Sequence, residues 1–182
     1  IPKDIVMLNW DYSPDGNRID RTDEFVKAGL AVVGCSGTNG WQSHGTRMDR
    51  ANANIHKFAR IAREQDAEGL LNTDWGDYGH RNPLGVSLHA YALGGACAWG
   101  GEQVDLKTFT RSFTYHTFGD GSGELAAAVR TLGGWDGNEL YHALVEPLSD
   151  EGDWGDYMLG RRVIGGEHIG RRLRAIRARA EN

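Results

Sequence analysis

The chain has 182 residues, 40% of them hydrophobic and 25% charged, which indicates one folded globular domain or one domain with a small appendage. The formal net charge of −5 is unevenly distributed, because residues 1–160 carry 13 basic and 23 acidic side chains whereas residues 161–182 carry seven Arg and two Glu. The acidic body argues against a general nucleic-acid-binding protein, and no apolar run reaches the roughly 18–20 residues that span a bilayer, so neither nucleic acid nor a membrane is expected as a partner.

The first hundred residues alternate short apolar runs with helix-compatible segments. Residues 4–10 form a nearly continuous apolar run, which is typical of a strand covered on both faces. Residues 20–28 are compatible with a short helix, and residues 30–34 are a second strand candidate. Residues 47–63 predict a longer helix, because one apolar stripe contains Met48, Ala51, Ile55, Phe58 and Ala62.

A third unit of the same kind follows. Residues 69–74 are the next strand candidate, and Asn82 and Pro83 look like an N-cap and a first helical residue. The helix that begins there runs to about Trp99, and most of its faces carry small, apolar side chains, so we expect it to be buried. Three strand–helix pairs in succession predict an α/β fold with a parallel sheet.

The remainder of the chain is predicted to be helical. Asp105 is expected to cap a helix over residues 106–118, and further helices are expected at residues 124–132, 139–145 and 167–180. The last of these is rich in arginine. We favour a solvated helix packed on the acidic body over a nucleic-acid or phosphate patch, because aromatic residues are not interleaved with the arginines.

Polar and aromatic residues follow each predicted strand, at the edge where parallel α/β folds carry their sites. They are Trp10 and Asp11 after the first strand, Asn39, Trp41, Gln42 and His44 after the second, and Trp75 and Asp77 after the third. Aromatic faces stack on the C–H face of a sugar ring, and carboxylates or amides bind its hydroxyl pairs. One such Trp would be equally consistent with a core or lid role, but three at equivalent positions predict a carbohydrate-binding pocket.

Asp74 and Asp77 are the closest approach to the paired carboxylates of a glycosidase. A capping or loop hydrogen bond is the favoured interpretation for Asp74, and sugar binding is favoured for Asp77. No pair of histidines has the spacing of metal ligands, so we predict no metal site, and we predict no cofactor. His80 is a weaker candidate for the sugar pocket. No nucleophile elbow, P-loop or dinucleotide fingerprint is present.

Residues 69–80 (GLLNTDWGDYGH), with Asn82 and Pro83 and the small-residue helix ending at Trp99, resemble the last βα unit of the family 20 glycoside hydrolases, the β-N-acetylhexosaminidases. The likeness is to a bacterial subgroup with a Thr-Asp-Trp-Gly-Asp pattern at its eighth strand. Residues 34–41 and 47–55 resemble the preceding unit, and residues 105–133 resemble the helical tail of that subgroup. The resemblance covers about residues 4–133.

The resemblance implies a (β/α)8 TIM barrel, of which residues 1–103 are units six to eight and residues 104–182 are a C-terminal helical extension. Family enzymes remove terminal β-linked N-acetylhexosamine by substrate-assisted retaining catalysis, in which the 2-acetamido oxygen attacks the anomeric carbon. An adjacent Asp-Glu pair after the fourth strand orients the acetamido group and acts as general acid. That pair is expected upstream of this chain, so no catalytic residue is assigned and the fragment alone is expected to be inactive.

The resemblance assigns the wall of the sugar pocket. Trp75 matches the family's Trp after the eighth strand, which packs on the sugar or its acetamido methyl group. Asp77 stands where the family usually has a Glu that binds sugar hydroxyls, and its shorter side chain shifts the reach of the charge. Trp10 matches the aromatic residue after the sixth strand, while Asn39 and Trp41 occupy the region where the family has a Tyr and an Asp.

Three functional hypotheses follow. The first is the sugar-binding part of such a glycosidase, the second is a non-catalytic carbohydrate-binding module, and the third is an α/β domain whose Trp loops bind a protein. Three βα units cannot close a barrel, so we expect the chain to bind the missing N-terminal part of the barrel or to self-associate.

The remaining expectations concern the cysteines and the location of the protein. Cys35 and Cys97 are expected as free buried thiols, because a disulfide scaffold needs more cysteines in a shorter chain. Ile1 is not an initiator methionine and no signal peptide precedes it, so a processed, cleaved or fragmentary chain is expected. A bacterial, cytoplasmic protein is favoured over a secreted one.

Overall fold

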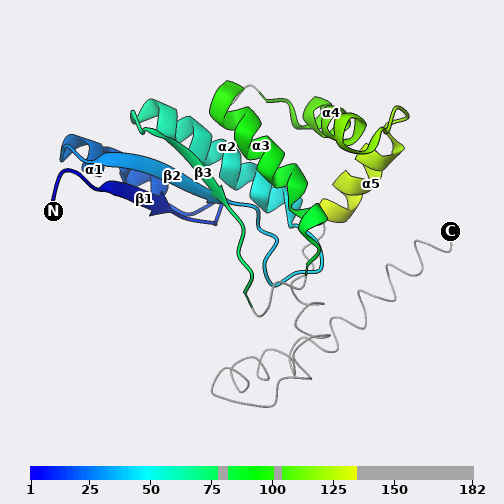
Figure 1. The fold of residues 1–182 in the computed structure, drawn as a ribbon, viewed down its shortest axis with the longest axis horizontal. Coiled ribbons are helices and arrows are strands. Elements are labelled where there is room, and N and C mark those ends of the chain that lie inside the picture. Colours follow the sequence, from blue (N-terminus) through cyan, green and yellow to red (C-terminus); the bar gives the residue numbers. More distant parts are fainter. Residues whose placement is uncertain (78–81, 101–103, 135–182) are drawn as a thin grey trace, which may run out of the picture.

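The computed structural model describes residues 1–77, 82–100 and 104–134 (Figure 1). Over these ranges the chain is a mixed α/β protein with a three-stranded parallel sheet and five helices. The strands are β1 (Val6–Trp10), β2 (Ala31–Gly37) and β3 (Gly69–Thr73). The helices are α1 (Thr22–Lys27), α2 (Met48–Glu64), α3 (Leu88–Gly100), α4 (Leu106–Phe118) and α5 (Glu124–Gly133).

The sheet has the strand order β1-β2-β3, so neighbours in the sequence are neighbours in the sheet. Val6 lies opposite Ala31, and Val33 lies opposite Gly69, in two parallel pairings. The predicted succession of three βα units and the predicted parallel sheet are therefore confirmed. β2 continues to Gly37, beyond the expected end at Gly34, because Ser36 and Gly37 pair with the end of β3.

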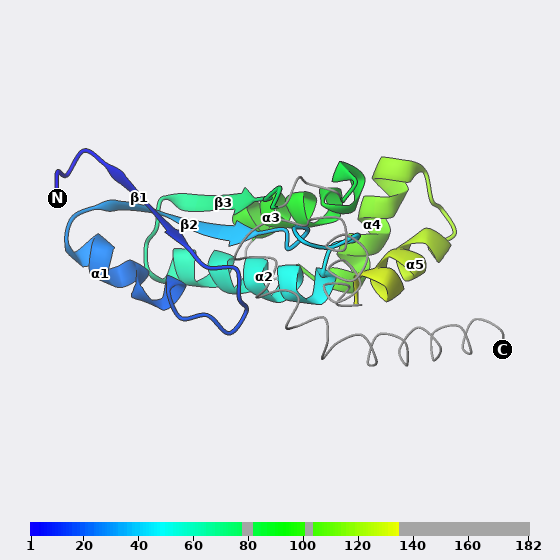
Figure 2. The ribbon, with the colours of Figure 1, turned by 90° about the horizontal axis from the view of Figure 1, so that it is seen from below.

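Helices α2 and α3 cover one face of the sheet (Figures 1 and 2). The predicted stripe of α2 is confirmed, since all of its five apolar residues are buried. A Cβ on Gly34 of β2 would lie 3.4 Å from side-chain carbons of both Ile19 and Phe58, so the missing side chain lets α2 pack closely on the sheet. Ile19 precedes α1 and joins Phe58 and Ile61 in the core, which places the β1–β2 crossover on the same side as α2.

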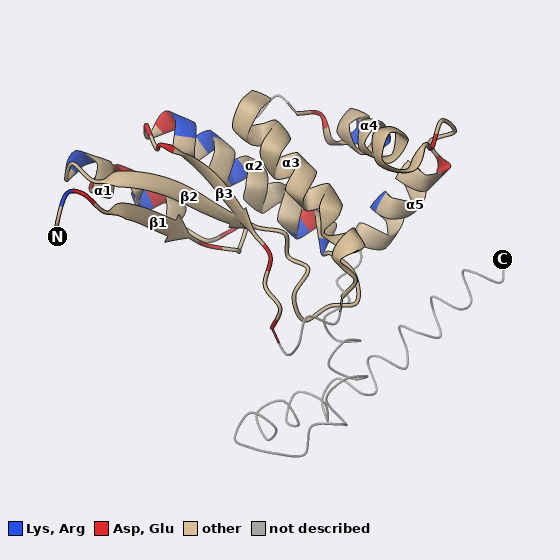
Figure 3. Ribbon diagram, viewed as in Figure 1, with Lys and Arg blue, Asp and Glu red and all other residues tan. Residues whose placement is uncertain are grey.

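The opposite face of the sheet is apolar and largely uncovered by the described residues. Val6, Leu8 and Leu71 point to this face, and Val6 and Leu8 are each more than half exposed. The three strands contain no charged residue, and the charge lies on the helices and loops (Figure 3). Within the described ranges β1 and β3 each pair with one neighbour only, so both edges of the sheet are open. Parallel sheets normally have both faces covered.

Two expectations for α3 are wrong. The helix begins at Leu88 after a 3-10 turn (Leu84–Val86), and Asn82 donates a side-chain hydrogen bond to Ser87 Oγ (3.4 Å) instead of capping a helix. The helix is also not buried on most faces: Leu93 and Cys97 face the core, whereas Trp99 is 94% exposed. Only one face of α3 meets the sheet and α2, so small apolar residues on the other side remain at the surface.

The helical region after the sheet begins as predicted. The Asp105 carboxylate accepts the backbone N–H of Thr108 (2.7 Å) and caps α4. His89 of α3 is 3% exposed and joins α3 to α4, since its Nε2 lies 3.0 Å from Thr110 Oγ1 and its ring contacts Phe109 and Phe113 edge-on. Burial lowers the pKa of His89 from 6.5 to about 4.

The expected helices at residues 139–145 and 167–180 lie outside the described residues. Cys35 and Cys97 are buried free thiols, as predicted. No helix in the described ranges has both the length and the apolar character needed to cross a bilayer.

Candidate functional site

Four aromatic rings meet at the carboxyl end of the sheet, and we call them the aromatic cluster: Trp10, Tyr12, Trp41 and Trp75. Tyr12 stands at its centre, with ring centroids 5.3 Å from Trp10, 4.9 Å from Trp41 and 6.2 Å from Trp75. Trp10 ends β1, Trp41 follows β2 and Trp75 follows β3. The three post-strand loops, which the sequence predicts to be neighbours, therefore converge on one residue.

The cluster is fixed by a hydrogen bond and by a glycine. The Tyr12 hydroxyl accepts the indole N–H of Trp75 (2.6 Å). A Cβ on Gly37 would lie only 2.7 Å from the Tyr12 ring and 2.8 Å from the Trp41 ring, so both rings lie directly over the end of β2. Trp10 and Trp75 remain half-exposed. The cluster therefore presents part of the Trp10 and Trp75 rings to solvent from a fixed position.

Asn54 of α2 ties the cluster to the body of the protein. Its side chain is fully buried, its Nδ2 donates to the backbone oxygen of Asp11 (2.9 Å), and its Oδ1 accepts the N–H of Gly37 (3.0 Å). One buried amide thus holds the loop after β1 and the end of β2 together. A buried amide with both ends hydrogen-bonded specifies geometry at little cost in free energy.

The loop after β2 has an unusual backbone conformation. Asn39 and Gln42 have φ angles of +56° and +50°, in the left-handed region that few non-glycine residues adopt. The buried Arg47 holds this loop, since its guanidinium donates to the backbone oxygens of Trp41 (2.8 Å) and Asn39 (3.3 Å). Asn39 is 2% exposed and donates to Gly37 O (3.3 Å), so its side chain supports the loop.

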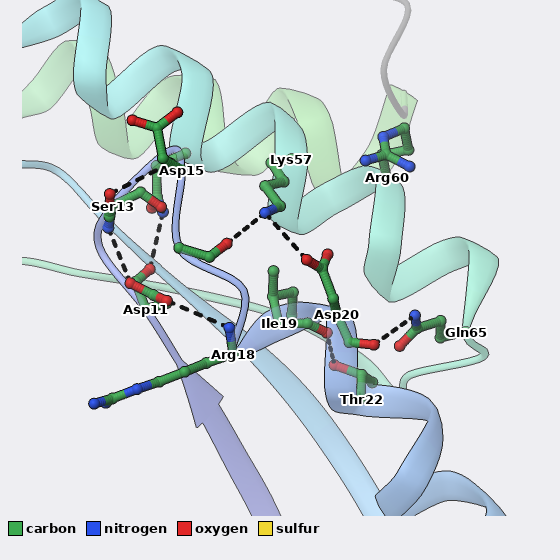
Figure 4. A network of polar contacts seen from close by, with 12 residues as sticks. Asp11, Ser13, Asp15, Arg18, Ile19, Asp20, Thr22, Lys57, Arg60 and Gln65 are labelled. Carbon is green, nitrogen blue, oxygen red and sulfur yellow. Dashed lines mark hydrogen bonds and ion pairs between the residues drawn. The ribbon is translucent and has the colours of Figure 1, made fainter.

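The carboxylates near the cluster differ in their surroundings. The Thr38 hydroxyl donates to Asp74 Oδ1 (2.5 Å), which is the loop hydrogen bond favoured for this residue. Asp11 accepts the backbone N–H of Ser13 (3.1 Å) and of Arg18 (3.4 Å) and closes the loop after β1 (Figure 4). Asp77 is exposed and accepts a weak hydrogen bond from Gln42 (3.4 Å). Asp11 and Asp74 therefore stabilise loops, and Asp77 is the one of the three at the surface.

A hollow of about 490 Å³ lies beside the aromatic cluster, between the loop after β1, the loop after β2 and the start of α2. Its volume falls in the range of about 300–1,000 Å³ that is usual for ligand-binding clefts. The residues that line it are Trp10, Asp11, Tyr12, Ser13, Arg18, Asn39, Trp41, Arg47 and Arg50. Among the described residues, no group of three or more His, Cys, Asp or Glu side chains is placed to hold a metal ion.

The structure brings together Trp10, Trp41 and Trp75 of the predicted site residues, and it places Asp77 beside Gln42. Asn39 is buried in the loop after β2. His80 lies outside the described residues. The sequence places Tyr12 in the loop after the first strand, two positions after Trp10, but we did not predict it as a site residue, and its central position is seen only in the structure.

Asn54 was also not predicted, although an amide on the apolar stripe of α2, three residues after Ala51 and four before Phe58, was a signal for it.

Comparisons of the chain with protein-family models, with curated proteins and with solved structures found no match. The aromatic cluster and the hollow beside it are therefore the features that support a functional proposal.

Proposed function

We propose that this chain supplies the sugar-binding wall of a glycoside hydrolase that removes terminal β-linked N-acetylhexosamine by substrate-assisted retaining catalysis. The observation that carries the proposal is the aromatic cluster, in which rings from three consecutive post-strand loops meet over the carboxyl end of a parallel sheet. Exposed aromatic faces in a fixed arrangement bind the C–H face of a sugar ring. Sites in parallel α/β folds lie at this end of the strands.

The arrangement of the layers favours a barrel fold and not an open, doubly wound sheet. In doubly wound folds the helices cover both faces of the sheet, whereas in a (β/α)8 barrel they cover only the outer face. Here the described helices lie on one side (Figure 1). The exposed apolar residues Val6, Leu8 and Leu71 share the other face by the strand register. We propose that this second face is the interior of a barrel whose other strands pair with β1 and β3.

The residues of the cluster have distinct roles in this proposal. Trp75 stacks on the sugar or its acetamido methyl group, with its ring held by Tyr12. Asp77 binds sugar hydroxyls from its exposed position, and Trp10 and Trp41 complete the wall. Asn39 acts through the loop that carries Trp41. Asp11 and Asp74 have loop hydrogen bonds, so we place the catalytic Asp-Glu pair in a segment outside this sequence.

An NMR titration that measures the affinity of the chain for N-acetylglucosamine tests the proposal. Trp75→Ala is expected to weaken binding about tenfold, which corresponds to the ~1.4 kcal/mol that one stacked ring contributes. Trp99→Ala is the matched control, because Trp99 is 94% exposed on α3 and is not part of the cluster. Equal affinity in the wild type and Trp75→Ala would contradict the role of the cluster.

A hydrolysis assay with an aryl N-acetylglucosaminide tests the catalytic part. We expect no turnover by this chain alone and turnover when the remaining barrel is present. Hydrolysis by the chain alone would contradict the placement of the acid in another segment.

The open sheet predicts a second property of the chain. Three βα units do not close a barrel, and open edges with an apolar face favour association. We expect the isolated chain to self-associate, and to become a defined complex when the other barrel strands are supplied. A light-scattering mass that corresponds to a stable monomer at all concentrations would contradict this expectation.

A non-catalytic carbohydrate-binding module is the second candidate function. It is favoured by the loop hydrogen bonds of Asp11 and Asp74, which leave Asp77 as the exposed carboxylate at the cluster. The hydrolysis assay separates the two candidates, because a binding module binds sugar without turnover even when every neighbouring segment of the protein is present.

A further inference from the structure

The hollow beside the aromatic cluster contains an unusual concentration of positive charge. Arg18, Arg47 and Arg50 all line it, and Asp11 is the single acidic residue among the lining residues. The Asp11 oxygens accept two backbone N–H groups within its own loop (Figure 4). The whole chain, by contrast, has a formal net charge of −5. A basic hollow on an acidic protein focuses potential on one place and attracts anions there.

The three arginines have different surroundings. Arg47 is buried and donates to two backbone oxygens, so it holds the loop after β2. Arg18 and Arg50 are exposed, and the described residues give neither guanidinium a salt bridge. The Arg18 guanidinium lies 4.6 Å over the Trp10 ring, which holds it at the hollow, and no described residue forms a salt bridge with it. Figure 4 shows this side chain extending away from the contacts that surround Lys57.

A planar guanidinium with free N–H groups matches the oxygens of a carboxylate, sulfate or phosphate. Two such groups at one hollow fit a ligand that carries a full negative charge better than they fit a neutral sugar. Lysines on flexible stems would give a less specific site, because an ammonium group lacks the fork geometry of arginine.

The hollow and the aromatic cluster share Trp10, Tyr12 and Trp41. A sugar held against the exposed part of these rings would therefore direct a substituent toward the arginines. We propose that the hollow is an anion subsite, in which Arg18 and Arg50 bind the carboxylate, sulfate or phosphate group of an acidic sugar. The sugar part of this inference rests on the proposed function, whereas the anion part rests on the arginines alone.

The test compares three ligands by NMR titration of the chain: N-acetylglucosamine, glucuronate and inorganic phosphate. We expect glucuronate to bind at least tenfold more tightly than the neutral sugar, and this preference to decrease when ionic strength is raised about tenfold. Arg18→Gln and Arg50→Gln are each expected to abolish most of the preference. Arg60→Gln is the matched control, because Arg60 lies on α2 like Arg50 but does not line the hollow and forms a salt bridge with Glu64 (2.7 Å).

The outcomes distinguish this inference from the proposed function. If phosphate binds as well as glucuronate and both are lost in Arg18→Gln, the anion subsite is supported with a free anion as its source. If glucuronate and phosphate bind through the arginines while the neutral sugar does not bind, the subsite stands and the proposed function fails. If glucuronate binds no better than N-acetylglucosamine, or if Arg60→Gln reduces the preference as much as Arg18→Gln, the anion subsite is overturned.

Discussion

His89 makes the stability of the fold dependent on pH in a way that can be calculated from its surroundings. Its pKa is about 4 in the folded chain, against 6.5 for an ordinary histidine, because burial between α3 and α4 disfavours the charged form. Below pH 6.5 the unfolded chain therefore binds a proton that the folded chain does not. The free energy of unfolding falls as pH decreases from 6.5 to about 4, and is then constant with respect to this group.

The size of the effect follows from about 1.4 kcal/mol per pKa unit. The full penalty is about 3 kcal/mol, and about 2 kcal/mol of it is already present at pH 5. Urea unfolding followed by circular dichroism at about pH 7.5 and about pH 5 measures it. The wild type is expected to lose about 2 kcal/mol more than His89→Gln, which keeps an amide near Thr110 but does not titrate.

His116→Gln is the matched control, because His116 is an exposed histidine of α4, and it is expected to follow the wild type. Acidic residues that titrate in the same range are common to all three chains, so their contribution cancels in the differences. If His89→Gln and the wild type lose the same free energy between the two pH values, the burial argument for His89 is refuted.

Two further predictions concern packing and capping. Gly37→Ala places a Cβ 2.7 Å from the Tyr12 ring, so it is expected to lower the free energy of unfolding by about 1–3 kcal/mol and to change the tryptophan fluorescence. Gly45→Ala is the control: a Cβ at Gly45 meets nothing within 4 Å, so neither the free energy of unfolding nor the fluorescence is expected to change. Asp105→Ala removes the acceptor for the Thr108 N–H and is expected to cost about 1 kcal/mol in urea unfolding, and an unchanged midpoint would contradict the capping role.

The parts of the fold that were predicted correctly are those in which one strong local signal dominates. The three strands are short apolar runs between polar segments, and α2 has an uninterrupted apolar stripe whose residues are all buried. The cap at Asp105 needs only the three residues that follow it. The neighbourhood of the three post-strand loops followed from the general rule for parallel sheets.

The parts that were missed depend on contacts between distant segments. Asn82 followed by Pro83 has the local pattern of a helix start, but the amide is bound to Ser87 and the helix begins at Leu88. The centre of the cluster at Tyr12 depends on residues 29 and 63 positions away, Trp41 and Trp75. No spacing within one loop specifies that geometry, and the same is true of the Asn54 amide, which joins the loop after β1 to the end of β2.

The consecutive order of the strands has a consequence for how the chain acquires its structure during synthesis. The pairing of β2 with β1 begins where Val6 lies opposite Ala31, and the pairing of β3 with β2 begins where Val33 lies opposite Gly69. Each strand therefore pairs with the strand that precedes it in the sequence. Among the described strands each pairing joins neighbours in the sequence, so β1 and β2 can pair before β3 is synthesised, and the sequence separation between paired strands stays small for a parallel sheet.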